Sequence, residues 1–278
     1  MHIRIAGSLN LHRDPHLEPL GSRTLPAAAP WDTFLPSSDV STSLSARHSV
    51  SQLAPPRSLF RYLPRNYSVL NTQLRKTIRQ KRRNITDAEK DRCGKQLTQI
   101  CIDDAWLTDS QHIACFLDSD GEIATDALIK QLLTIGKSVY LPILNPDKAN
   151  TLLFARYQAG DKLIPNKFGI LEPDLAAQAP IDTRTLDLVL MPLVVFDHQG
   201  NRLGMGGGYY DRTFSYLLDQ NFDNQGIDGQ NIDSENSRPR LAGLAYSFQQ
   251  VDQLKPAAWD VPLEKVFTEL SVVSVSSN

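Results

Sequence analysis

The chain has 278 residues, of which 41% are hydrophobic and 22% are charged, a balance typical of a globular protein. Its formal net charge of −2 argues against a general nucleic-acid binder, and no apolar run approaches the length of about eighteen residues that spans a bilayer. The three cysteines, Cys93, Cys101 and Cys115, lack the paired spacing of a metal site. We therefore expect reduced, buried thiols in a cytoplasmic protein.

The first 66 residues differ in composition from the rest of the chain. They contain seven arginines and four acids but no lysine, and they show no sustained apolar periodicity. Such a segment buries too little apolar surface to offset its ordering entropy, so we expect residues 1–66 to be disordered and residues 67–278 to form one domain. Two origins of this segment stay open: an organelle transit peptide, or a start codon assigned too far upstream.

The ordered part is predicted to begin with a basic helix that includes residues 74–83, with Leu74 and Ile78 on one face. Its positive charge is typical either of a solvated helix face or of a basic rim beside a phosphate site. Thr86 and Glu89 have the spacing of a capping box and are predicted to open a second helix.

Strand and helix signals alternate along the remaining chain. The predicted strands are residues 112–117, 137–143, 151–157, 186–196, 241–246 and 265–268, and the predicted helices are residues 125–133, 209–218 and 249–254. Residues 161–173 are predicted to form a long loop, and the acidic stretch at about 219–237 is predicted to be a polar surface insertion. This alternation predicts an α/β fold, a three-layer α-β-α arrangement with a mostly parallel sheet.

The most informative stretch is the glycine-rich loop at residues 204–208, between a predicted buried strand and a predicted helix. Three consecutive glycines sacrifice roughly 1 kcal/mol each of helix propensity relative to alanine, which indicates a close backbone approach or positive φ. Exposed amides there, with Arg202 and Arg212 on either side, predict a phosphate site. A phosphate site tolerates the nearby Asp211 best if Mg²⁺ lies between them.

The glycine-rich loop allows other interpretations. A tight turn whose glycines serve only packing is one alternative. A Walker loop is excluded because no Gly-Lys-Ser/Thr follows, and a dinucleotide fingerprint is disfavoured because Tyr209 stands where its third glycine belongs. Because residues 118–122, 202–211 and 259–260 all follow predicted strands or the elements after them, we expect them to share one site.

Together these residues resemble the 5-formyltetrahydrofolate cyclo-ligase family, over about residues 70–268 and most closely its proteobacterial members. The most specific match is the segment from Pro192 to Arg212, with its Gly-Asn-Arg-Leu-Gly-Met-Gly-Gly-Gly-Tyr-Tyr-Asp-Arg run. Supporting matches are Leu74-Arg75-Lys76, Asp120 to Ile123 with Thr125, Phe168 to Pro173, and Trp259-Asp260.

The resemblance implies an ATP- and Mg²⁺-dependent ring closure. In this family the γ-phosphoryl group of ATP passes to the formyl oxygen of 5-formyltetrahydrofolate, a folate nitrogen attacks the activated carbon, and phosphate leaves to give 5,10-methenyltetrahydrofolate. We therefore expect ATP and Mg²⁺ as cofactors, the folate as substrate, no nucleic-acid or membrane partner, and a monomer. A cytoplasmic location is expected, with organellar import through residues 1–66 left open.

The resemblance also implies roles for individual residues. The nucleotide would contact Asn71, Arg75, Arg202, Leu203, Gly204, Met205, Gly206, Gly207, Gly208, Tyr209 and Tyr210, of which Arg202 and Tyr210 would be catalytic. Family members usually carry a basic residue at the position of Asn71, so this chain departs from the pattern there. Arg75 or Lys76 would have to compensate for the missing charge.

The remaining implied contacts concern the folate and the metal. The folate would contact Leu117, Glu122, Phe168, Met205, Gly206, Gly207, Gly208 and Tyr209. Glu122 would accept hydrogen bonds from the pterin, and Phe168 would stack on it. Asp211 and Asp260 would hold Mg²⁺, which relieves the repulsion between two neighbouring carboxylates.

Two competing functions stay open at this stage. One is a sugar-phosphate isomerase or CoA transferase on a related three-layer fold, which would bind phosphate without hydrolysing ATP. The other is a catalytically silent nucleotide- or RNA-binding module, suggested by the basic residues between 75 and 83.

Overall fold

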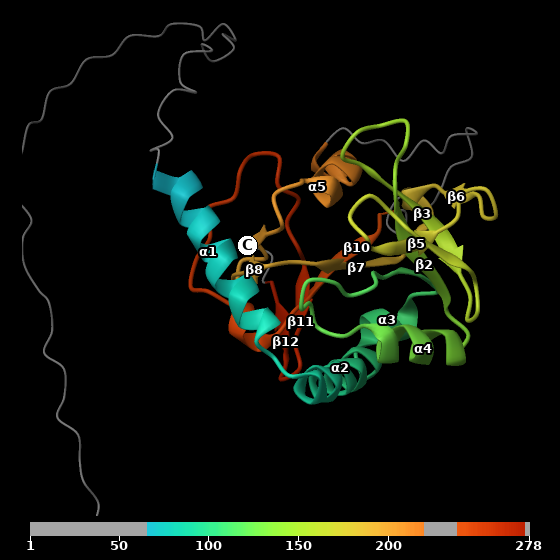
Figure 1. Cartoon of the computed structure of the whole chain (residues 1–278), viewed down its shortest axis with the longest axis horizontal. Helices are drawn as coiled ribbons and strands as arrows, with labels where there is room; N and C mark the ends of the chain where they lie inside the picture. Colours follow the sequence, from blue (N-terminus) through green and yellow to red (C-terminus); the bar gives the residue numbers. More distant parts are fainter. Residues whose placement is uncertain (1–65, 220–237, 276–278) are drawn as a thin grey trace, which may run out of the picture. The chain divides into compact units, whose positions relative to one another are not determined.

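A mixed eight-stranded sheet forms the centre of the computed structural model, which describes residues 66–219 and 238–275 (Figure 1). The predictions for residues 1–65 and for the acidic insertion after residue 219 lie outside the described residues, and the single domain at 67–278 stays a prediction. The strand order is β12-β11-β10-β7-β1-β2-β3-β6. The strands are β1 (His112–Ala114), β2 (Ser138–Leu144), β3 (Leu152–Tyr157), β6 (Pro180–Ile181), β7 (Leu188–Pro192), β10 (Arg240–Leu244), β11 (Lys265–Phe267) and β12 (Val272–Ser274).

The five consecutive strands β11, β10, β7, β1 and β2 pair in parallel, which confirms the predicted mostly parallel sheet. β12, β3 and β6 are antiparallel additions at the two edges. β3 runs against β2 because the connection between them is too short for a parallel crossover. β3 confirms the strand predicted at residues 151–157, but its antiparallel direction and the edge strands β6 and β12 were not predicted.

The central strand β7 shows why its sequence is continuously apolar. Leu188 and Leu190 contact the core on one side of the sheet, and Val189 and Met191 contact the core on the other. All four are fully buried, as expected for a strand covered on both faces. The single strand predicted at residues 186–196 is in fact two strands, because the chain turns after Pro192 and continues as β8 (Val195–Phe196).

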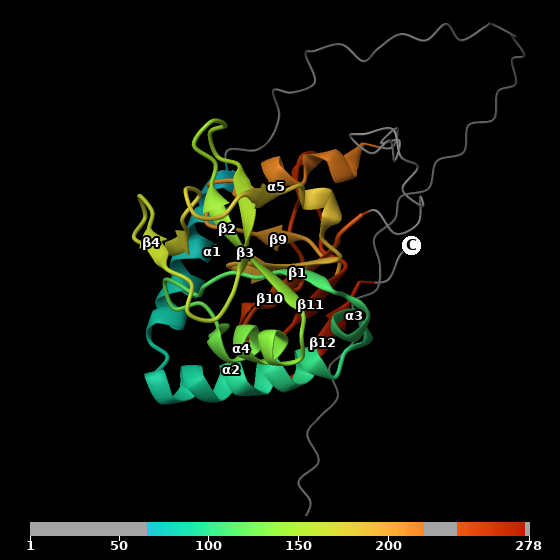
Figure 2. The ribbon, with the colours of Figure 1, turned by 90° about the vertical axis from the view of Figure 1, so that its right-hand side faces the viewer.

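Helices cover the sheet unequally. Figure 2 shows α2 (Asp87–Ile102) and α4 (Asp126–Thr134) below the sheet, α3 (Ala105–Asp109) at its right-hand side, and the single turn α5 (Tyr209–Thr213) above it. Short 3-10 turns lie at Thr183–Thr185, Ser215–Leu218 and Ser247–Gln249. The three cysteines are buried free thiols, as predicted, and all three belong to the core on one side of the sheet. Burial raises the pKa of Cys115 to about 12.

The long helix α1 (Asn66–Arg83) docks beside the glycine-rich loop. Its Leu74 and Ile78 pack on Val194 and Leu203, which belong to the segment around the hairpin of β8 and β9 (Arg202–Leu203). α2 begins as predicted, with Glu89 N donating to Thr86 Oγ1 at 3.2 Å.

Three further predictions of local structure differ from the structure. The loop predicted at residues 161–173 contains a hairpin of β4 (Leu163–Pro165) and β5 (Leu171–Pro173). The helix predicted at residues 249–254 is one 3-10 turn followed by extended chain, because the buried Gln249 side chain donates to the carbonyls of Leu193 and Val194. The predicted helix at residues 209–218 is divided into α5 and a 3-10 turn.

The turn between β8 and β9 is held by the side chain of Asp197, which also binds the segment around Leu254. Buried Asp197 accepts hydrogen bonds from Gln199 N at 2.9 Å and Asn201 N at 3.0 Å through Oδ1, and from Leu254 N at 2.8 Å through Oδ2. Gly200 adopts φ +80° there, with its carbonyl accepting from Leu263 N at 2.9 Å.

Gly200→Ala is expected to lower the free energy of unfolding by about 2–4 kcal/mol, because it adds left-handed strain to overpacking. A Cβ at this position would overlap the Leu263 carbonyl and lie 2.8 Å from Val275 Cγ2. Gly160→Ala is the matched control, since Gly160 has φ +93° but open space around it. Urea unfolding of both variants measures the difference, and equal losses would contradict the packing explanation.

Candidate functional site

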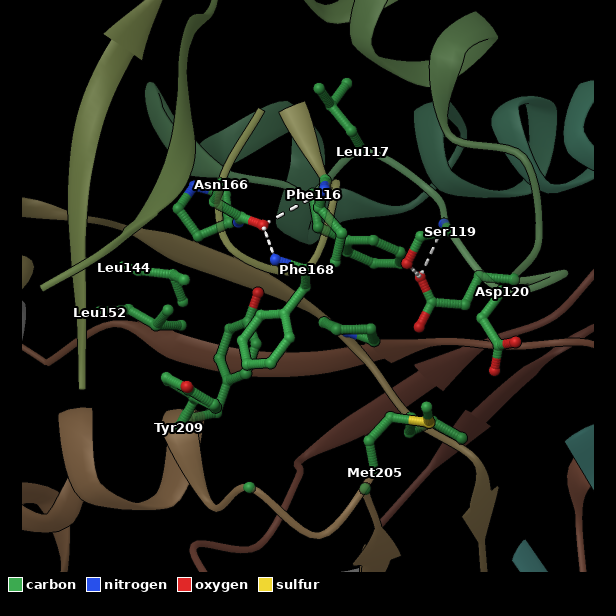
Figure 3. A pocket seen from close by; sticks show the side chains of 18 of the residues that line it. Phe116, Leu117, Ser119, Asp120, Leu144, Leu152, Asn166, Phe168, Met205 and Tyr209 are labelled. Carbon is green, nitrogen blue, oxygen red and sulfur yellow. Dashed lines mark hydrogen bonds between the residues drawn. The ribbon is translucent and has the colours of Figure 1, made fainter. Parts of the chain in front are cut away.

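A cavity of about 650 Å³ opens beside the carboxyl ends of β1, β2 and β7, where ligands bind in parallel sheets. Its walls come from the loop after β1, the end of β2, the β4–β5 hairpin, the corner after β7, the glycine-rich loop and one side chain of α1. Figure 3 shows Phe168 and Tyr209 on one side, Ser119 and Asp120 on the other, and Met205 below them. Residues of the segments 118–122 and 202–211 therefore line one cavity, as predicted, whereas Trp259 and Asp260, which were expected to share it, do not line it.

The glycine-rich loop needs its glycines for geometric reasons. Gly206 and Gly208 have φ values of +100° and +63°, and a Cβ on Gly207 would lie 2.7 Å from the Tyr209 ring. α5 is only five residues long, so the expected helix-dipole contribution is smaller than a full helix would supply. A phosphate site here rests on loop amides and arginines.

Two arginines hold the loop from outside. Arg75 Nε donates to Gly204 O at 2.7 Å from α1, and Arg212 Nη1 donates to Gly207 O at 2.5 Å. Burial lowers the pKa of Arg75, and the nearby Asp260 carboxylate partly offsets this effect. Arg75 therefore holds the glycine-rich loop and interacts electrostatically with the Asp260 carboxylate.

Arg202 and Asp211 form an ion pair at the cavity wall. Arg202 Nη2 lies 2.6 Å from Asp211 Oδ1, and the Arg202 side chain is only 6% exposed. Arg202 Nη1 also donates to Val261 O, and Val261 N donates to Asp211 Oδ1 at 3.3 Å. These contacts fasten the segment around Asp260 to the start of α5.

The two predicted metal ligands lie in this region, although only Asp211 lines the cavity. Asp260 Oδ2 accepts from Ala257 N at 2.8 Å and closes its own loop. Among the described residues, no cluster of three or more His, Cys, Asp or Glu side chains is suited to a metal. A donor set of two carboxylates fits Mg²⁺ bound together with phosphate oxygens and water, but not a metal site formed by protein alone.

Glu122 lines the cavity, with its side chain 11% exposed. Its Oε2 accepts from Ser119 N at 3.0 Å, and its Oε1 lies 4.0 Å from Arg82 Nη1. Burial raises the pKa of Glu122 to about 7, while the Ser119 amide and Arg82 act in the opposite direction. The preceding turn requires positive φ at Asp120 and Gly121.

An aromatic pair also borders the cavity. Phe168, 58% exposed at the tip of the β4–β5 hairpin, meets the Tyr209 ring edge-on at 6.2 Å between centroids. Asn166 Oδ1 shapes the tip by accepting from Phe168 N at 2.9 Å and Ile170 N at 3.2 Å (Figure 3). A planar ligand could lie against either ring.

Tyr210 contributes differently from Tyr209. Its ring stacks on Phe214 at 6.4 Å and meets Phe154 edge-on at 6.5 Å. Burial raises the pKa of Tyr210 far above its ordinary value, so its phenol keeps its proton. Tyr210 is therefore suited to shaping the site or donating a hydrogen bond, and not to acting as a base.

Most of the predicted site residues meet at the cavity. Those lining it are Leu117, Glu122, Phe168, Arg202, Gly204, Met205, Gly207, Gly208, Tyr209, Tyr210 and Asp211. Those outside its lining are Asn71, Arg75, Leu203, Gly206 and Asp260.

Sequence reasoning missed the residues that support the hairpin. Glu172 Oε2 accepts from Leu144 N at 3.1 Å and from Asn166 Nδ2 at 3.0 Å, which ties the hairpin to the end of β2. Asn166, three residues before Gly169, was an available turn signal.

Comparison with known proteins decides the family. The model of the 5-formyltetrahydrofolate cyclo-ligase family matches residues 68–269. The chain belongs to this family. Among the family's enzymes, the 5-formyltetrahydrofolate cyclo-ligase of Haemophilus influenzae is 40% identical over 191 residues, covering 69% of this chain and 93% of that protein. The enzyme of the same name from Escherichia coli K12 is 37% identical, covering 70% and 98%.

Solved structures of 5,10-methenyltetrahydrofolate synthetases have the same fold as this chain. The Aquifex aeolicus protein has a TM-score of 0.59 at 27% identity and covers 75% of this chain and 94% of its own. The Mycoplasma pneumoniae protein has a TM-score of 0.51 at 25% identity, covering 72% and 98%. In residues 66–219 and 238–275, no helix is long and apolar enough to cross a membrane.

Proposed function

We propose that the protein converts 5-formyltetrahydrofolate to 5,10-methenyltetrahydrofolate with consumption of ATP and release of ADP and phosphate. The observation that carries this proposal is that the glycine-rich loop and Glu122 line one cavity. A phosphoryl donor and a folate formyl group can therefore meet inside one site. The family of the chain and its coverage of nearly the whole of its relatives support the same conclusion.

Catalysis by this site would rest on positioning and electrostatics, as in other phosphoryl transfers. Loop amides and Arg202 would bind phosphate oxygens, while Phe168 and Tyr209 would hold the pterin ring and Glu122 would accept its N–H groups. Asp211 and Asp260 would hold Mg²⁺, which neutralises phosphate charge when bound. Because the folate itself supplies the attacking nitrogen, no nucleophile of the enzyme is required.

The internal contacts of the basic helix disfavour the RNA-binding alternative. Three of its arginines, Arg79, Arg82 and Arg83, contact Asp120 of the same molecule. Much of the positive charge of α1 is thus neutralised by ion pairs within the same molecule. The expected monomer and cytoplasmic location stay predictions.

The experiment that tests the function uses the full-length chain with 5-formyltetrahydrofolate, Mg²⁺ and ATP, followed by methenyl-folate absorbance and phosphate release. We expect product only when all three are present, with one phosphate released per methenyl group formed. Absence of product at high enzyme concentration would refute the proposal, and product without ATP would favour a different chemistry.

Glu122→Gln is expected to raise the KM for the folate by about tenfold to a hundredfold, because a charged hydrogen-bond acceptor becomes neutral. In the wild type, the carboxylate ionises as pH rises through its pKa of about 7, so folate KM should fall between about pH 6 and 8. The variant should lack this inflection. Steady-state kinetics across this range tests both points, with the KM for ATP as internal control.

A further inference from the structure

Arg82 is an arginine whose side chain is fully buried, in the last turn of α1. Its Nη1 donates to Leu193 O at 3.1 Å, and its Nη2 donates to Asp120 O at 3.2 Å and to Asp120 Oδ2 at 3.3 Å. Its Nη1 also lies 4.0 Å from Glu122 Oε1. A buried guanidinium is costly unless it is paired, so these contacts indicate a specific task.

The neighbouring charges show which acid Arg82 balances. Asp120 is already served from outside by Arg79 Nε at 2.7 Å and by Arg83 Nε at 2.6 Å. Asp118 pairs with Lys90 at 2.5 Å. Glu122 is the remaining acid of this turn, and among the described residues its ion-pair partner is Arg82, at 4.0 Å, which also pairs with Asp120 at 3.3 Å.

The other groups around Glu122 do not substitute for this cation. Asp118 and Asp120 are acids of the same turn and oppose its ionisation. Ser119 donates to Glu122 Oε2 from its backbone N at 3.0 Å and from its Oγ at 3.4 Å, but it carries no charge. From the side of the Ser247–Gln249 turn, the Tyr246 hydroxyl donates to the backbone oxygen of Glu122 at 3.4 Å, not to its carboxylate. Arg79 is turned to Asp120.

We propose that Arg82 is a positioning residue for folate recognition, which keeps Glu122 ionised and fixed at the cavity wall. This inference rests on the proposed function, in which Glu122 contacts the folate. Arg82 does not line the cavity. It acts through Glu122 and Leu193, both of which do.

The place of Arg82 on α1 adds a second consequence. Arg75, two helical turns earlier, donates to Gly204 O in the glycine-rich loop. At a rise of about 1.5 Å per residue, the two arginines are roughly 10 Å apart along one rigid helix. α1 therefore sets the spacing between the proposed phosphate end and the proposed folate end of the cavity.

The test compares neutral and charged replacements of Arg82 in the full-length chain. Arg82→Met and Arg82→Gln should raise the folate KM about tenfold and leave the ATP KM within about twofold. The inflection of folate KM should move upward by about one pH unit, because loss of a nearby cation makes the carboxylate harder to ionise. Arg82→Lys keeps the charge, so its folate KM should show the inflection at the wild-type pH. Its folate KM should lie between those of the wild type and the neutral variants.

Arg83→Met is the matched control, because Arg83 also pairs with Asp120 but is 51% exposed and does not contact Glu122. It should leave the folate KM and its inflection unchanged. Circular dichroism melting of every variant identifies loss of folding. If neither Arg82→Met nor Arg82→Gln folds, the test relies on Arg82→Lys. A folate KM of Arg82→Lys equal to that of the wild type would then overturn the proposal.

A titration separates this proposal from the proposed function. Carboxyl carbon NMR of Glu122, assigned with Glu122→Gln, reports its ionisation without any folate present. A raised midpoint in Arg82→Gln supports the positioning role even if the wild type forms no methenyl-folate, a result that would refute the function alone. An unchanged midpoint together with an unchanged KM inflection refutes the positioning role.

Discussion

Arg202→Met is expected to lower kcat by about 10²–10³-fold, the usual effect of removing a charge-stabilising donor from an active site. Arg202 faces the cavity and is nearly buried, so little solvent screens its charge. The substitution also releases Asp211 and the Val261 carbonyl, which the two guanidinium nitrogens now join. The variant would lose both the guanidinium that donates hydrogen bonds to phosphate and the contact that aligns the loop carrying Asp260.

Arg202→Lys separates these two tasks. It keeps a positive charge but not the planar fork that binds Asp211 and Val261 together, so we expect an intermediate loss of kcat. Arg184→Met is the control: Arg184 forms a similar fork, with Nη2 2.7 Å from Asp182 Oδ2, and it does not line the cavity. Turnover of Arg202→Met within threefold of the wild type would remove Arg202 from the catalytic residues.

The sequence predicted best those features that depend on local pattern. The apolar run of β7 was recognisable because each of its residues meets a core on one face or the other. The glycine-rich loop was recognisable because two of its glycines adopt positive φ and a third packs against the Tyr209 ring. In both cases the constraint lies within a few residues of chain.

The features that failed depend on contacts between distant segments. Helical periodicity after Gln249 was overridden because its amide satisfies carbonyls at the corner after β7, and because Val251 N pairs with Phe196 O at 2.9 Å. No property of residues 249–254 alone reveals those partners. The β4–β5 hairpin likewise depends on Glu172 reaching Leu144 N.

The basic run in α1 illustrates the same limit within the site. The sequence showed its arginines as one cluster, while the structure divides them among Gly204, Asp120 and the surroundings of Glu122. That division depends on how Leu74 and Ile78 dock on the β8–β9 hairpin. Helical spacing predicts which residues share a face of the helix. Which groups these residues contact depends on the segments against which the helix packs.

Asp211→Asn is expected to lower kcat at saturating folate by about tenfold to a hundredfold and to raise the Mg²⁺ concentration needed for half-maximal rate by a similar factor. Asparagine keeps an oxygen that can accept from Val261 N, so the loop should hold its shape while the negative charge is lost. A simple loss of packing would leave the Mg²⁺ requirement unchanged.

The Mg²⁺ titration therefore carries the test, with Asp126→Asn as control because Asp126 pairs with Lys130 on the exposed face of α4. Asp260→Asn should shift the Mg²⁺ requirement in the same direction, and the double variant should lose less than the product of the single effects, since both carboxylates would serve one ion. An unchanged Mg²⁺ requirement in Asp211→Asn would show that this carboxylate serves Arg202 alone, and that the metal is held by the phosphates and other groups.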